Sequence, residues 1–457
     1  MSEVLSVILA AGKGTRMKSD TIKVLHTVAG VPMIKHVVEN VSEFCSDIVV
    51  VIGHQGEKVS NTFNETEKIN FVTQEKQLGT GHAVIQAKEY IKDFDGTVLV
   101  LYGDTPLLKC STLRELVRKH ENAEAACTVL TAIVDNPQGY GRIVRTGNQS
   151  INKIVEEKDA DQDEKTIKEI NSGVCCFNSK MLLEALENLD NDNVQGEYYL
   201  TDTIGYLSRK GHVIMPLVVD DNNDIIGIND RVNLAKAEKI MRQRINKKHM
   251  DNGVTIIDPD TTYIDSQVKI GYDTIIYPFT YIEGKSIIGD HCVVGSHSRI
   301  VSGLVGNYVN IKDHSIIIES DIANQVNVGP FAYIRPGCSI ADEVKIGDFV
   351  ELKKAAIGKG TKVPHLSYVG DAKIGEGTNI GAGTIFANYD GKEKHRTRVG
   401  NNVFIGSNTT LIAPVKVNDK GKTGAGSVVT KDVDKGITVV GVPAKRFAKN
   451  TGGKGEY

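Results

Sequence analysis

An aliphatic residue returns at every sixth position through most of the stretch from Ile264 to Val429. A period of six fits neither the stripe of an amphipathic helix nor the strict alternation of a half-buried strand. It is typical of a parallel β-helix, in which short strands each send one aliphatic residue inward and are separated by turns. The two longest runs are Ile264, Ile270, Ile276, Ile282, Ile288, Val294 and Ile300, and Ile316, Ile322, Val328, Ile334, Ile340, Ile346 and Leu352.

Glycine follows many of these aliphatic residues, as at Ile270-Gly271 and Ile346-Gly347. It lets the backbone turn a tight corner without a Cβ clash. The repeat continues through Val363, Ile380 and Ile405 with small slips, which we interpret as loops leaving the coil. Because the aliphatic side chains fill such a coil, any functional site must lie on its sides, in its loops or between copies.

Length and composition narrow the class of protein. A chain of 457 residues exceeds the usual size of one core, so we expect two domains. The net charge of -3 and the lack of a long basic run argue against a nucleic-acid partner. No apolar stretch reaches membrane-spanning length and no cleavable signal precedes the first predicted strand, so we expect a cytoplasmic protein. The seven cysteines include no Cys-x-x-Cys pair and are expected to be reduced.

The N-terminal half begins with an apolar strand at 4–9 that leads into a glycine loop at 10–17. A strand, a glycine loop and a following helix present backbone N–H groups to phosphate. The loop lacks both the Walker A ending and the spacing of the dinucleotide fingerprint. From composition alone, a plain structural turn is about as good an interpretation as a nucleotide loop.

Alternating elements follow: a helix at 33–43, a strand at 48–52 and a strand at 97–102 that ends in Gly103-Asp104. This order predicts a Rossmann-like α/β domain with a mostly parallel sheet. Ligands bind beyond the carboxyl ends of the strands in such sheets. We therefore expect the glycine loop and Asp104 to face one site.

A helix is also predicted at 231–250, where apolar residues recur at helical spacing without proline or glycine. Its basic residues could belong to a nucleic-acid-binding arm, but a solvated face is the better interpretation because the rest of the domain is not basic. The sequence thus predicts a first domain at 1–230, a linker helix at 231–250 and a β-helix domain at 251–457.

Ordered motifs carry a resemblance to a known family. They are Leu9-Ala10-Ala11-Gly12-x-Gly14-Thr15-Arg16-Met17, Lys23, Gln74, Gly79-Thr80-Gly81-His82-Ala83, Tyr102-Gly103-Asp104, Gly139-Tyr140-Gly141-Arg142-Ile143, Glu156, Asn171-Ser172-Gly173, Glu197-Tyr198-Tyr199-Leu200-Thr201-Asp202 and Gly227-Ile228-Asn229. The first part resembles sugar-1-phosphate nucleotidyltransferases. Together with the repeat, the chain resembles the bacterial bifunctional N-acetylglucosamine-1-phosphate uridylyltransferase and glucosamine-1-phosphate N-acetyltransferase family over nearly its whole length. One departure is Ile22, where the family typically has proline before the lysine.

The resemblance implies that the β-helix is left-handed and that the first domain transfers UMP from UTP to N-acetylglucosamine-1-phosphate. Asp104 and Asn229 would hold Mg²⁺ through oxygen atoms, while Arg16 and Lys23 would stabilise the triphosphate and the transition state. Such a reaction needs positioning and charge neutralisation rather than a covalent intermediate. The expected UTP and UDP-N-acetylglucosamine contacts are Leu9, Ala10, Ala11, Gly12, Lys23, Gln74, Gly79, Thr80, Tyr102, Gly103, Asp104, Gly141, Glu156, Asn171 and Asn229.

The resemblance places the acetyltransferase site in the β-helix, where polar and aromatic residues gather between Arg335 and Asp390. A neutral imidazole can take the proton that an amine loses when it attacks a thioester, so His365 is the expected general base and Glu351 the residue that orients it. The expected contacts to the sugar phosphate and the acetyl group are Arg335, Lys353, Tyr368, Asn379, Asn388 and Tyr389.

For acetyl-CoA, the matching positions are Ala382, Ser407 and Ala425. The family also uses an arginine near the C-terminus for the coenzyme phosphates, and that arginine is displaced in this chain. Arg446 or Lys445 is the candidate to replace it. The tail at 452–457 is expected to be disordered.

The first hypothesis is therefore a bifunctional enzyme that acetylates glucosamine-1-phosphate and then makes UDP-N-acetylglucosamine, a cell-wall precursor. The alternative is a single-activity sugar-1-phosphate nucleotidyltransferase whose β-helix serves assembly or regulation. A third hypothesis is a regulatory subunit that keeps both folds without chemistry. The resemblance also implies a homotrimer with small-molecule substrates only.

Overall fold

The computed structural model describes residues 3–63, 68–147 and 150–447. The predicted disorder of the tail at 452–457 lies outside the described residues. The chain divides into two compact units, Met1–Met241 and Arg242–Tyr457. Helix α8 (Arg231–Asp251) contains the point of division and covers the helix predicted from the sequence.

The first unit is built on a nine-stranded sheet with the strand order β11-β7-β10-β6-β1-β4-β5, extended by β8 and β9. The strands are β1 (Val4–Ala10), β4 (Asp47–Ile52), β5 (Ile69–Thr73), β6 (Thr97–Tyr102), β7 (Cys127–Ile133), β8 (Arg142–Thr146), β9 (Ser150–Val155), β10 (Glu169–Asn178) and β11 (Ile214–Val218). Strand β1 runs parallel to β4 and β6, whereas β10 is antiparallel to β6 and β7. The prediction of a mostly parallel sheet is confirmed.

Helices cover both faces of this sheet. They are α1 (Met33–Ser42), α2 (Gly56–Ser60), α3 (Thr80–Ile85), α4 (Lys88–Lys92), α5 (Cys110–Asn122), α6 (Ser179–Glu187) and α7 (Leu200–Arg209). All seven residues of β1 are buried because alternate side chains enter different cores. Val7 packs with residues of α6 and α7 such as Leu182, while Ile8 packs with residues of α1 and α5 such as Leu116. The sheet thereby holds the carboxyl end of β1 in a fixed place.

The glycine loop after β1 differs from the prediction. The expected helix is only a short 3-10 helix at Thr15–Met17. Gly14, with φ 62°, and Lys18, with φ 47°, flank it in the left-handed region, so the turn cannot extend in either direction. A Cβ atom on Gly14 would lie 2.5 Å from Lys23 Cβ, so glycine also lets these two segments touch.

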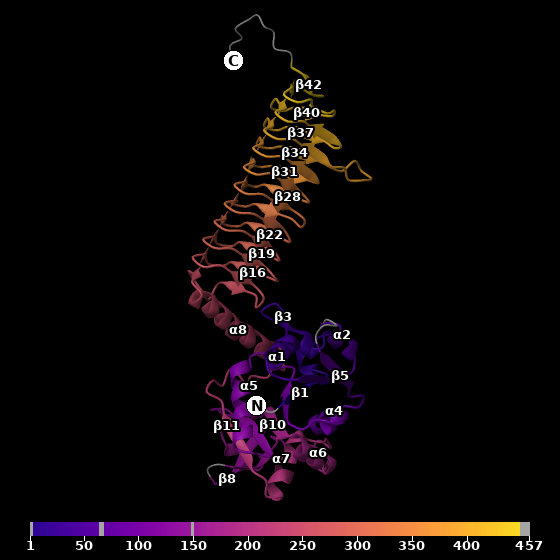
Figure 1. Cartoon of the computed structure of the whole chain (residues 1–457), viewed down its shortest axis with the longest axis vertical. Helices are drawn as coiled ribbons and strands as arrows, with labels where there is room; N and C mark the ends of the chain where they lie inside the picture. The colour runs from indigo at the N-terminus through magenta and orange to yellow at the C-terminus, as the bar shows by residue number, and fades with distance from the viewer. Residues whose placement is uncertain (1–2, 64–67, 148–149, 448–457) are drawn as a thin grey trace, which may run out of the picture. The chain divides into compact units, whose positions relative to one another are not determined.

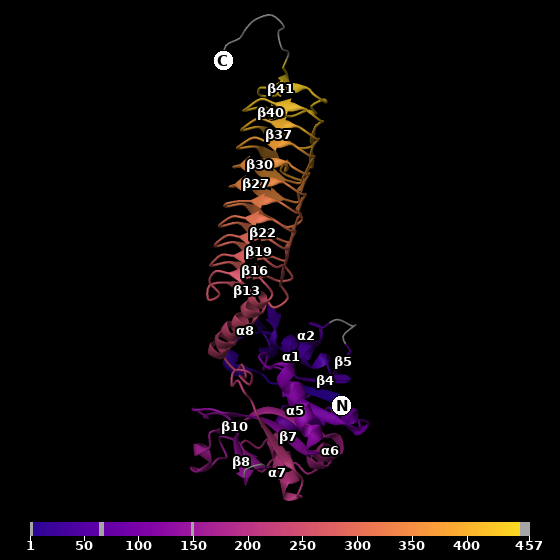
Figure 2. The ribbon, with the colours of Figure 1, turned by 60° about the vertical axis from the view of Figure 1, so that its left-hand side comes forward.

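The second unit is a parallel β-helix of short strands (Figures 1 and 2). Its three sheets have 12, 10 and 9 strands and begin with β12 (Thr255–Ile256), β13 (Tyr263–Ile264) and β14 (Lys269–Ile270). Apart from the last strands of the chain, each strand pairs with the third strand after it, as β12 pairs with β15 (Ile275–Ile276), so one turn of the coil contains three strands. The fold predicted from the hexapeptide period is confirmed.

The predicted aliphatic residues form the interior of this coil, and Ile276, Ile334 and Ile346 are fully buried. The prediction for Ile316 is wrong, because Ile316 is 37% exposed and Ile317 points inward instead. Ile300 pairs with Ile282 in one coil and with Ile317 in the next, so the second coil is one residue shorter. The run of isoleucines at 316–318 has no polar residue that would reveal this change.

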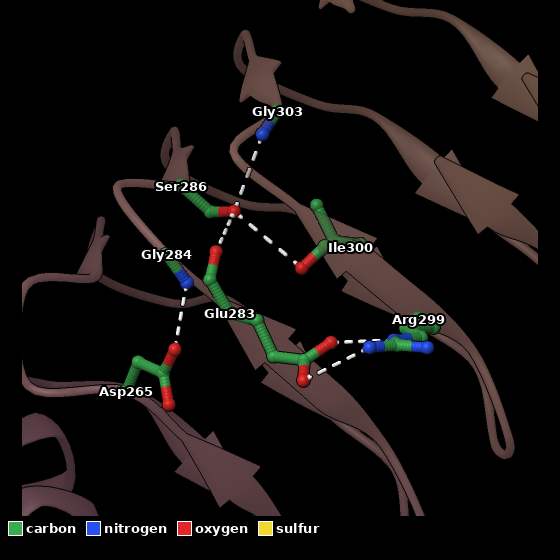
Figure 3. Close-up of polar contacts among 7 residues, drawn as sticks. All are labelled: Asp265, Glu283, Gly284, Ser286, Arg299, Ile300 and Gly303. Atoms are coloured by element: carbon green, nitrogen blue, oxygen red, sulfur yellow. Dashed lines mark hydrogen bonds and ion pairs between the residues drawn. The ribbon is translucent and has the colours of Figure 1, made fainter. Parts of the chain in front are cut away.

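Side chains on the outside tie successive coils together. Figure 3 shows Glu283 bound to Arg299 on the next coil, with Nε–Oε2 and Nη2–Oε1 distances of 2.5 and 3.2 Å. The backbone N–H of Gly284 donates to Asp265 Oδ2 at 2.7 Å. Much of the outer polar surface is therefore structural, and a functional site must be recognised by departures from this pattern. Across the described ranges, no helix is long and apolar enough to span a membrane.

Candidate functional sites

A cavity of about 240 Å³ lies at the carboxyl ends of β1 and β6 in the first unit. The glycine loop and Asp104 both line it, as the sequence predicts. Ten predicted contacts are among its lining residues, which are Leu9, Ala10, Ala11, Gly12, Lys23, Val24, Gln74, Gln77, Gly79, Thr80, Ala83, Tyr102, Asp104 and Glu197. Sequence reasoning did not assign Gln77 to the site, although its side-chain amide donates to the carbonyl oxygen of Ala11.

The two predicted magnesium ligands converge on one cationic group. Lys23, on the 3-10 helix Lys23–Leu25, is ion-paired with Asp104 Oδ2 and donates to Asn229 Oδ1 at 3.2 Å. The side chains of Lys23 and Asp104 are only 14% and 12% exposed. A carboxylate oxygen and an amide oxygen that already share a cation are the donor types that Mg²⁺ uses together with substrate phosphates. The residues present therefore fit the metal.

A second group of predicted contacts surrounds Glu156. The backbone N–H of Asn171 donates to the carbonyl oxygen of Gly141 at 2.9 Å. A Cβ atom on Gly141 would lie 3.5 Å from Glu156 Oε2, so these residues form one surface. Thr201 Oγ1 donates to Glu156 Oε1 at 3.0 Å, and burial raises the pKa of the Glu156 carboxyl. Thr201 was not predicted as a site residue.

Tyr102 links this group to the cavity. Its ring lies against the backbone of Gly173, where a Cβ atom would come within 2.1 Å of Tyr102 Cε2. Gly173 has φ +83°, a conformation that glycine adopts readily. Burial raises the pKa of Tyr102, and the nearby carboxylate of Glu156 raises it further. The nucleotide and sugar parts of the predicted site are therefore neighbours.

Arg16 and Gly103, like Gly141, Glu156, Asn171 and Asn229, are predicted residues that are not part of the cavity lining. Arg16 is exposed on the 3-10 helix Thr15–Met17. Gly103 is buried, and its N–H donates to the carbonyl oxygen of Leu9 at 3.0 Å. Gly103 thus supports the strand ends rather than presenting a surface to ligand.

In the β-helix, His365 is paired with a residue that the sequence analysis did not single out. Its Nδ1 lies 2.5 Å from Asp348 Oδ1. Asp348 ends β27 (Lys345–Asp348), His365 ends β30 (Lys362–His365), and the two residues are register partners on successive coils. The hydrogen bond with His365 lowers the pKa of the Asp348 carboxyl.

Glu351, which was predicted to orient His365, is hydrogen-bonded to a different residue in this structure. Glu351 Oε1 instead accepts from Arg335 Nη1 at 2.8 Å. Glu351 begins β28 (Glu351–Lys353), which pairs with β25 (Tyr333–Ile334) in the 10-stranded sheet. His365 belongs to the 12-stranded sheet. The two side chains therefore leave from different sides of the coil.

The loop after β34 (Ile385–Ala387) brings Asn388 and Tyr389 to this region. Asn388 is buried, its amide donates to Asp371 Oδ2 at 2.5 Å, and it lies 3.5 Å from the Tyr368 hydroxyl. Tyr389 is 59% exposed. The loop is closed by Asp390, whose Oδ2 lies 2.7 Å from His395 Nε2.

Lys394 on the same loop is a further residue that sequence reasoning missed. The neighbouring ammonium group of Lys353 lowers the pKa of Lys394. Two lysines that approach each other in this way repel and create a local excess of positive charge. Such a pair is suited to an anionic group of a substrate.

The three predicted acetyl-CoA positions form a column. β33 (Asn379–Ile380) pairs with β36 (Phe404–Ile405), which pairs with β39 (Lys422–Thr423). This register puts Ala382, Ser407 and Ala425 at equivalent positions on successive coils. On the next coil, β41 (Thr438–Val440) pairs with β42 (Lys445–Arg446), so both basic residues lie near the end of the column.

Two family models match the chain. Residues 5–237 match the nucleotidyl transferase model. Residues 267–302 match the bacterial transferase hexapeptide model of six repeats. The two matches fall in the first unit and in the β-helix, respectively.

Curated relatives match almost the whole chain. The bifunctional protein GlmU of Acetivibrio thermocellus is 52% identical over 95% of this chain and 94% of its own length. The protein of the same name from Listeria monocytogenes is 50% identical over 95% of this chain and 94% of its own length. That from Syntrophomonas wolfei is 51% identical over 94% of this chain and 95% of its own length. The chain therefore belongs to the bifunctional GlmU family, and the prediction that it is a bifunctional uridylyltransferase and acetyltransferase of UDP-N-acetylglucosamine synthesis is confirmed.

Proposed function

We propose that residues 1–230 transfer UMP from UTP to N-acetylglucosamine-1-phosphate in the cavity at the ends of β1 and β6. The phosphate of the sugar attacks the α-phosphorus of UTP and expels pyrophosphate. The backbone of the glycine loop, with Gln74, Gly79 and Thr80, binds the nucleotide, and Gly141, Glu156 and Asn171 bind the sugar. The support for this assignment is that the structure brings each set together.

Charge neutralisation is the main catalytic contribution that this site offers. Asp104 and Asn229 would hold Mg²⁺, which when bound supplies positive charge to the phosphate oxygens. Lys23 then contacts the triphosphate, because its ammonium group already lies at these two oxygens. Arg16 is exposed on the glycine loop and would contact the triphosphate from there.

We propose that residues 251–457 transfer an acetyl group from acetyl-CoA to the amine of glucosamine-1-phosphate. His365 takes the proton from the attacking amine. Arg335, Lys353 and Lys394 provide positive charge for the sugar phosphate, and Tyr368, Asn379, Asn388 and Tyr389 complete the contacts to the sugar and the acetyl group. The coenzyme would follow the column Ala382, Ser407 and Ala425 toward Lys445 and Arg446.

The observation that carries the acetyltransferase assignment is the surface around His365. The glycine-rich β-helix elsewhere uses its polar groups to link coils, as Glu283 and Arg299 do. In the stretch from Arg335 to Lys394, by contrast, Lys353 and Lys394 approach each other as like charges, and the half-exposed His365 keeps Nε2 open among the described residues while Nδ1 pairs with Asp348. These groups contribute little to packing and are suited to substrate chemistry.

Two assays on the wild-type chain test the proposal. CoA release is followed with acetyl-CoA and glucosamine-1-phosphate, and pyrophosphate release with UTP, N-acetylglucosamine-1-phosphate and Mg²⁺. The proposal predicts both. Pyrophosphate release without CoA release would instead support a single-activity nucleotidyltransferase with a β-helix for assembly or regulation.

We also propose that the chain acts as a homotrimer in the cytoplasm, where UTP and acetyl-CoA are available. One side of the coil carries the outward apolar residues Tyr281, Ile316, Tyr333 and Ile385, which are 37–41% exposed in a single chain. A surface of this kind favours packing against another copy. Light scattering of the purified chain measures the mass of the assembly directly, and a monomer would contradict this proposal.

A further inference from the structure

We propose that Asp348 is a positioning residue for acetyl transfer, which holds His365 in the tautomer that can accept a proton at Nε2. The inference rests on the proposed acetyltransferase function. It assigns to Asp348 the role that the sequence analysis gave to Glu351, and it follows from the observed pairs of all three side chains.

His365 and Asp348 are in direct contact through both their side chains and the backbone ladder. The 2.5 Å separation between His365 Nδ1 and Asp348 Oδ1 is within the range of a charge-assisted hydrogen bond. The two residues are backbone register partners on adjacent coils, and the N–H of Leu366 donates to the carbonyl oxygen of Asp348 at 3.0 Å. The ladder of the β-helix therefore fixes the spacing of the two side chains.

The hydrogen bond also determines where the imidazole proton lies. An ionised carboxylate can only accept, so the neutral ring must carry its proton on Nδ1. The Nε2 lone pair is then available. Nε2 of His365 has no hydrogen-bond partner among residues 3–63, 68–147 and 150–447, and the side chain is 52% exposed.

This tautomer suits the reaction step. As the amine nitrogen forms a bond to the thioester carbonyl carbon, its proton passes to His365 Nε2. The C–S bond breaks when the tetrahedral intermediate collapses, and the proton held by the imidazolium passes to the sulfur of CoA. Asp348 keeps its negative charge throughout and stabilises the imidazolium between the two proton transfers.

Glu351 is not available for the same task, since it accepts a hydrogen bond from Arg335 on another side of the coil. The other charged groups on the strands next to His365 are lysines. Lys345 lies on β27 with Asp348, and Lys362 lies on β30 with His365. β33, the following strand of this sheet, contributes Asn379, which is uncharged. Asp348 is thus the one carboxylate of these three strands.

The test is a double-mutant cycle with Asp348→Ala, His365→Ala and the double variant. Glu283→Gln is the matched control, because Glu283 also binds a basic side chain on the next coil (Figure 3) and lies several coils before Asp348. The steady-state parameters for CoA release are measured for each variant. Circular dichroism and thermal unfolding of the same preparations show that each β-helix is folded, and pyrophosphate release shows that the first unit is intact.

We expect Asp348→Ala to lower kcat for CoA release by about 10- to 100-fold with little change in KM, which is the usual size of the effect of removing an orienting carboxylate. In the His365→Ala background the same change is expected to cause no further loss. Glu283→Gln should behave as wild type. Asp348→Asn, which keeps a side-chain oxygen that can accept from Nδ1–H, should retain more activity than Asp348→Ala.

Two results would overturn the inference while leaving the acetyltransferase function intact. In the first, Asp348→Ala lowers kcat for CoA release by the same factor in the wild-type and His365→Ala backgrounds. In the second, Asp348→Ala raises KM and leaves kcat unchanged. Both would indicate a structural or binding role. Absence of CoA release by wild type would instead contradict the proposed function itself, and the inference with it.

Discussion

The ammonium group of Lys23 is ion-paired with the carboxylate of Asp104, and both side chains are largely buried. Asn229 accepts a second hydrogen bond from the same ammonium group at 3.2 Å. The lysine therefore occupies the position between the two oxygens that are proposed to hold Mg²⁺. Binding of the metal and the triphosphate requires Lys23 to exchange these oxygens for phosphate oxygens.

Removal of the metal should separate the two activities. With excess EDTA we expect pyrophosphate release to be lost and CoA release to be unchanged, because only the first reaction needs a cation at the phosphates. Asp104→Asn should lower pyrophosphate release by about 100-fold or more, the usual effect of losing a preorganised electrostatic group. Asp95→Asn is the control, since Asp95 is exposed and pairs with Lys180 at the surface. Equal sensitivity of both activities to EDTA would contradict this assignment.

Gly173 should be required for uridylyl transfer. An alanine at this position would place its Cβ atom within 2.1 Å of the Tyr102 ring and would have to adopt φ +83°. Displacing Tyr102 from the cavity is expected to cost about 100-fold in pyrophosphate release, because small misplacements of binding groups are costly. CoA release is the internal control. A Gly173→Ala variant with normal pyrophosphate release would show that the position of Tyr102 is not important.

Two neighbouring isoleucines provide a matched test of the coil interior. Ile288 is 1% exposed and Ile287 is 44% exposed. Ile288→Ala should lower the free energy of unfolding by about 2–5 kcal/mol, because it leaves a cavity in the core. Ile287→Ala should change it by about 0.5 kcal/mol or less. Urea unfolding followed by circular dichroism measures both free energies. Similar decreases in the two variants would mean that Ile288 does not point into the coil while Ile287 points outward.

Asp202 makes the stability of the first unit depend on pH. Burial, together with the negative charges of Asp190, Glu156 and Asp159, raises its pKa to about 6. The pKa in the unfolded chain is about 3.9, so between these values the folded state binds more protons than the unfolded state. The protonated form of Asp202 therefore stabilises the folded state at low pH, and this stabilisation is lost as pH rises from about 4 to about 6.

Asp202→Asn should consequently raise the Tm at pH 7.5 and have little effect at pH 4. Thermal unfolding at the two pH values tests this, with Asp135→Asn as a control because Asp135 is fully exposed. A Tm that falls at pH 7.5 would indicate that ionised Asp202 makes a favourable contact.

The sequence was most informative where a pattern repeats. The period of six predicted the inward residues and the parallel β-helix, because every strand sends one aliphatic residue into the same core. It failed at Ile316, where three consecutive isoleucines conceal a shortened coil. The glycine loop was placed correctly, but its following helix was not, because left-handed conformations at Gly14 and Lys18 cannot be read from residue types alone.

The partner of His365 could have been found from the same repeat. Residues one coil apart lie side by side, and Asp348 is one coil before His365. Glu351 lies on a different side of the coil, although it is nearer to His365 in the sequence. Lys394 could not have been found in this way, because it lies in a loop that interrupts the repeat.

The most direct test of the central claim is to separate the two sites by mutation. His365→Ala and Asp104→Asn are assayed in parallel for CoA release and pyrophosphate release. We predict that His365→Ala loses CoA release and retains pyrophosphate release, and that Asp104→Asn shows the opposite pattern. Loss of both activities in either folded variant would contradict the presence of two independent active sites in this chain.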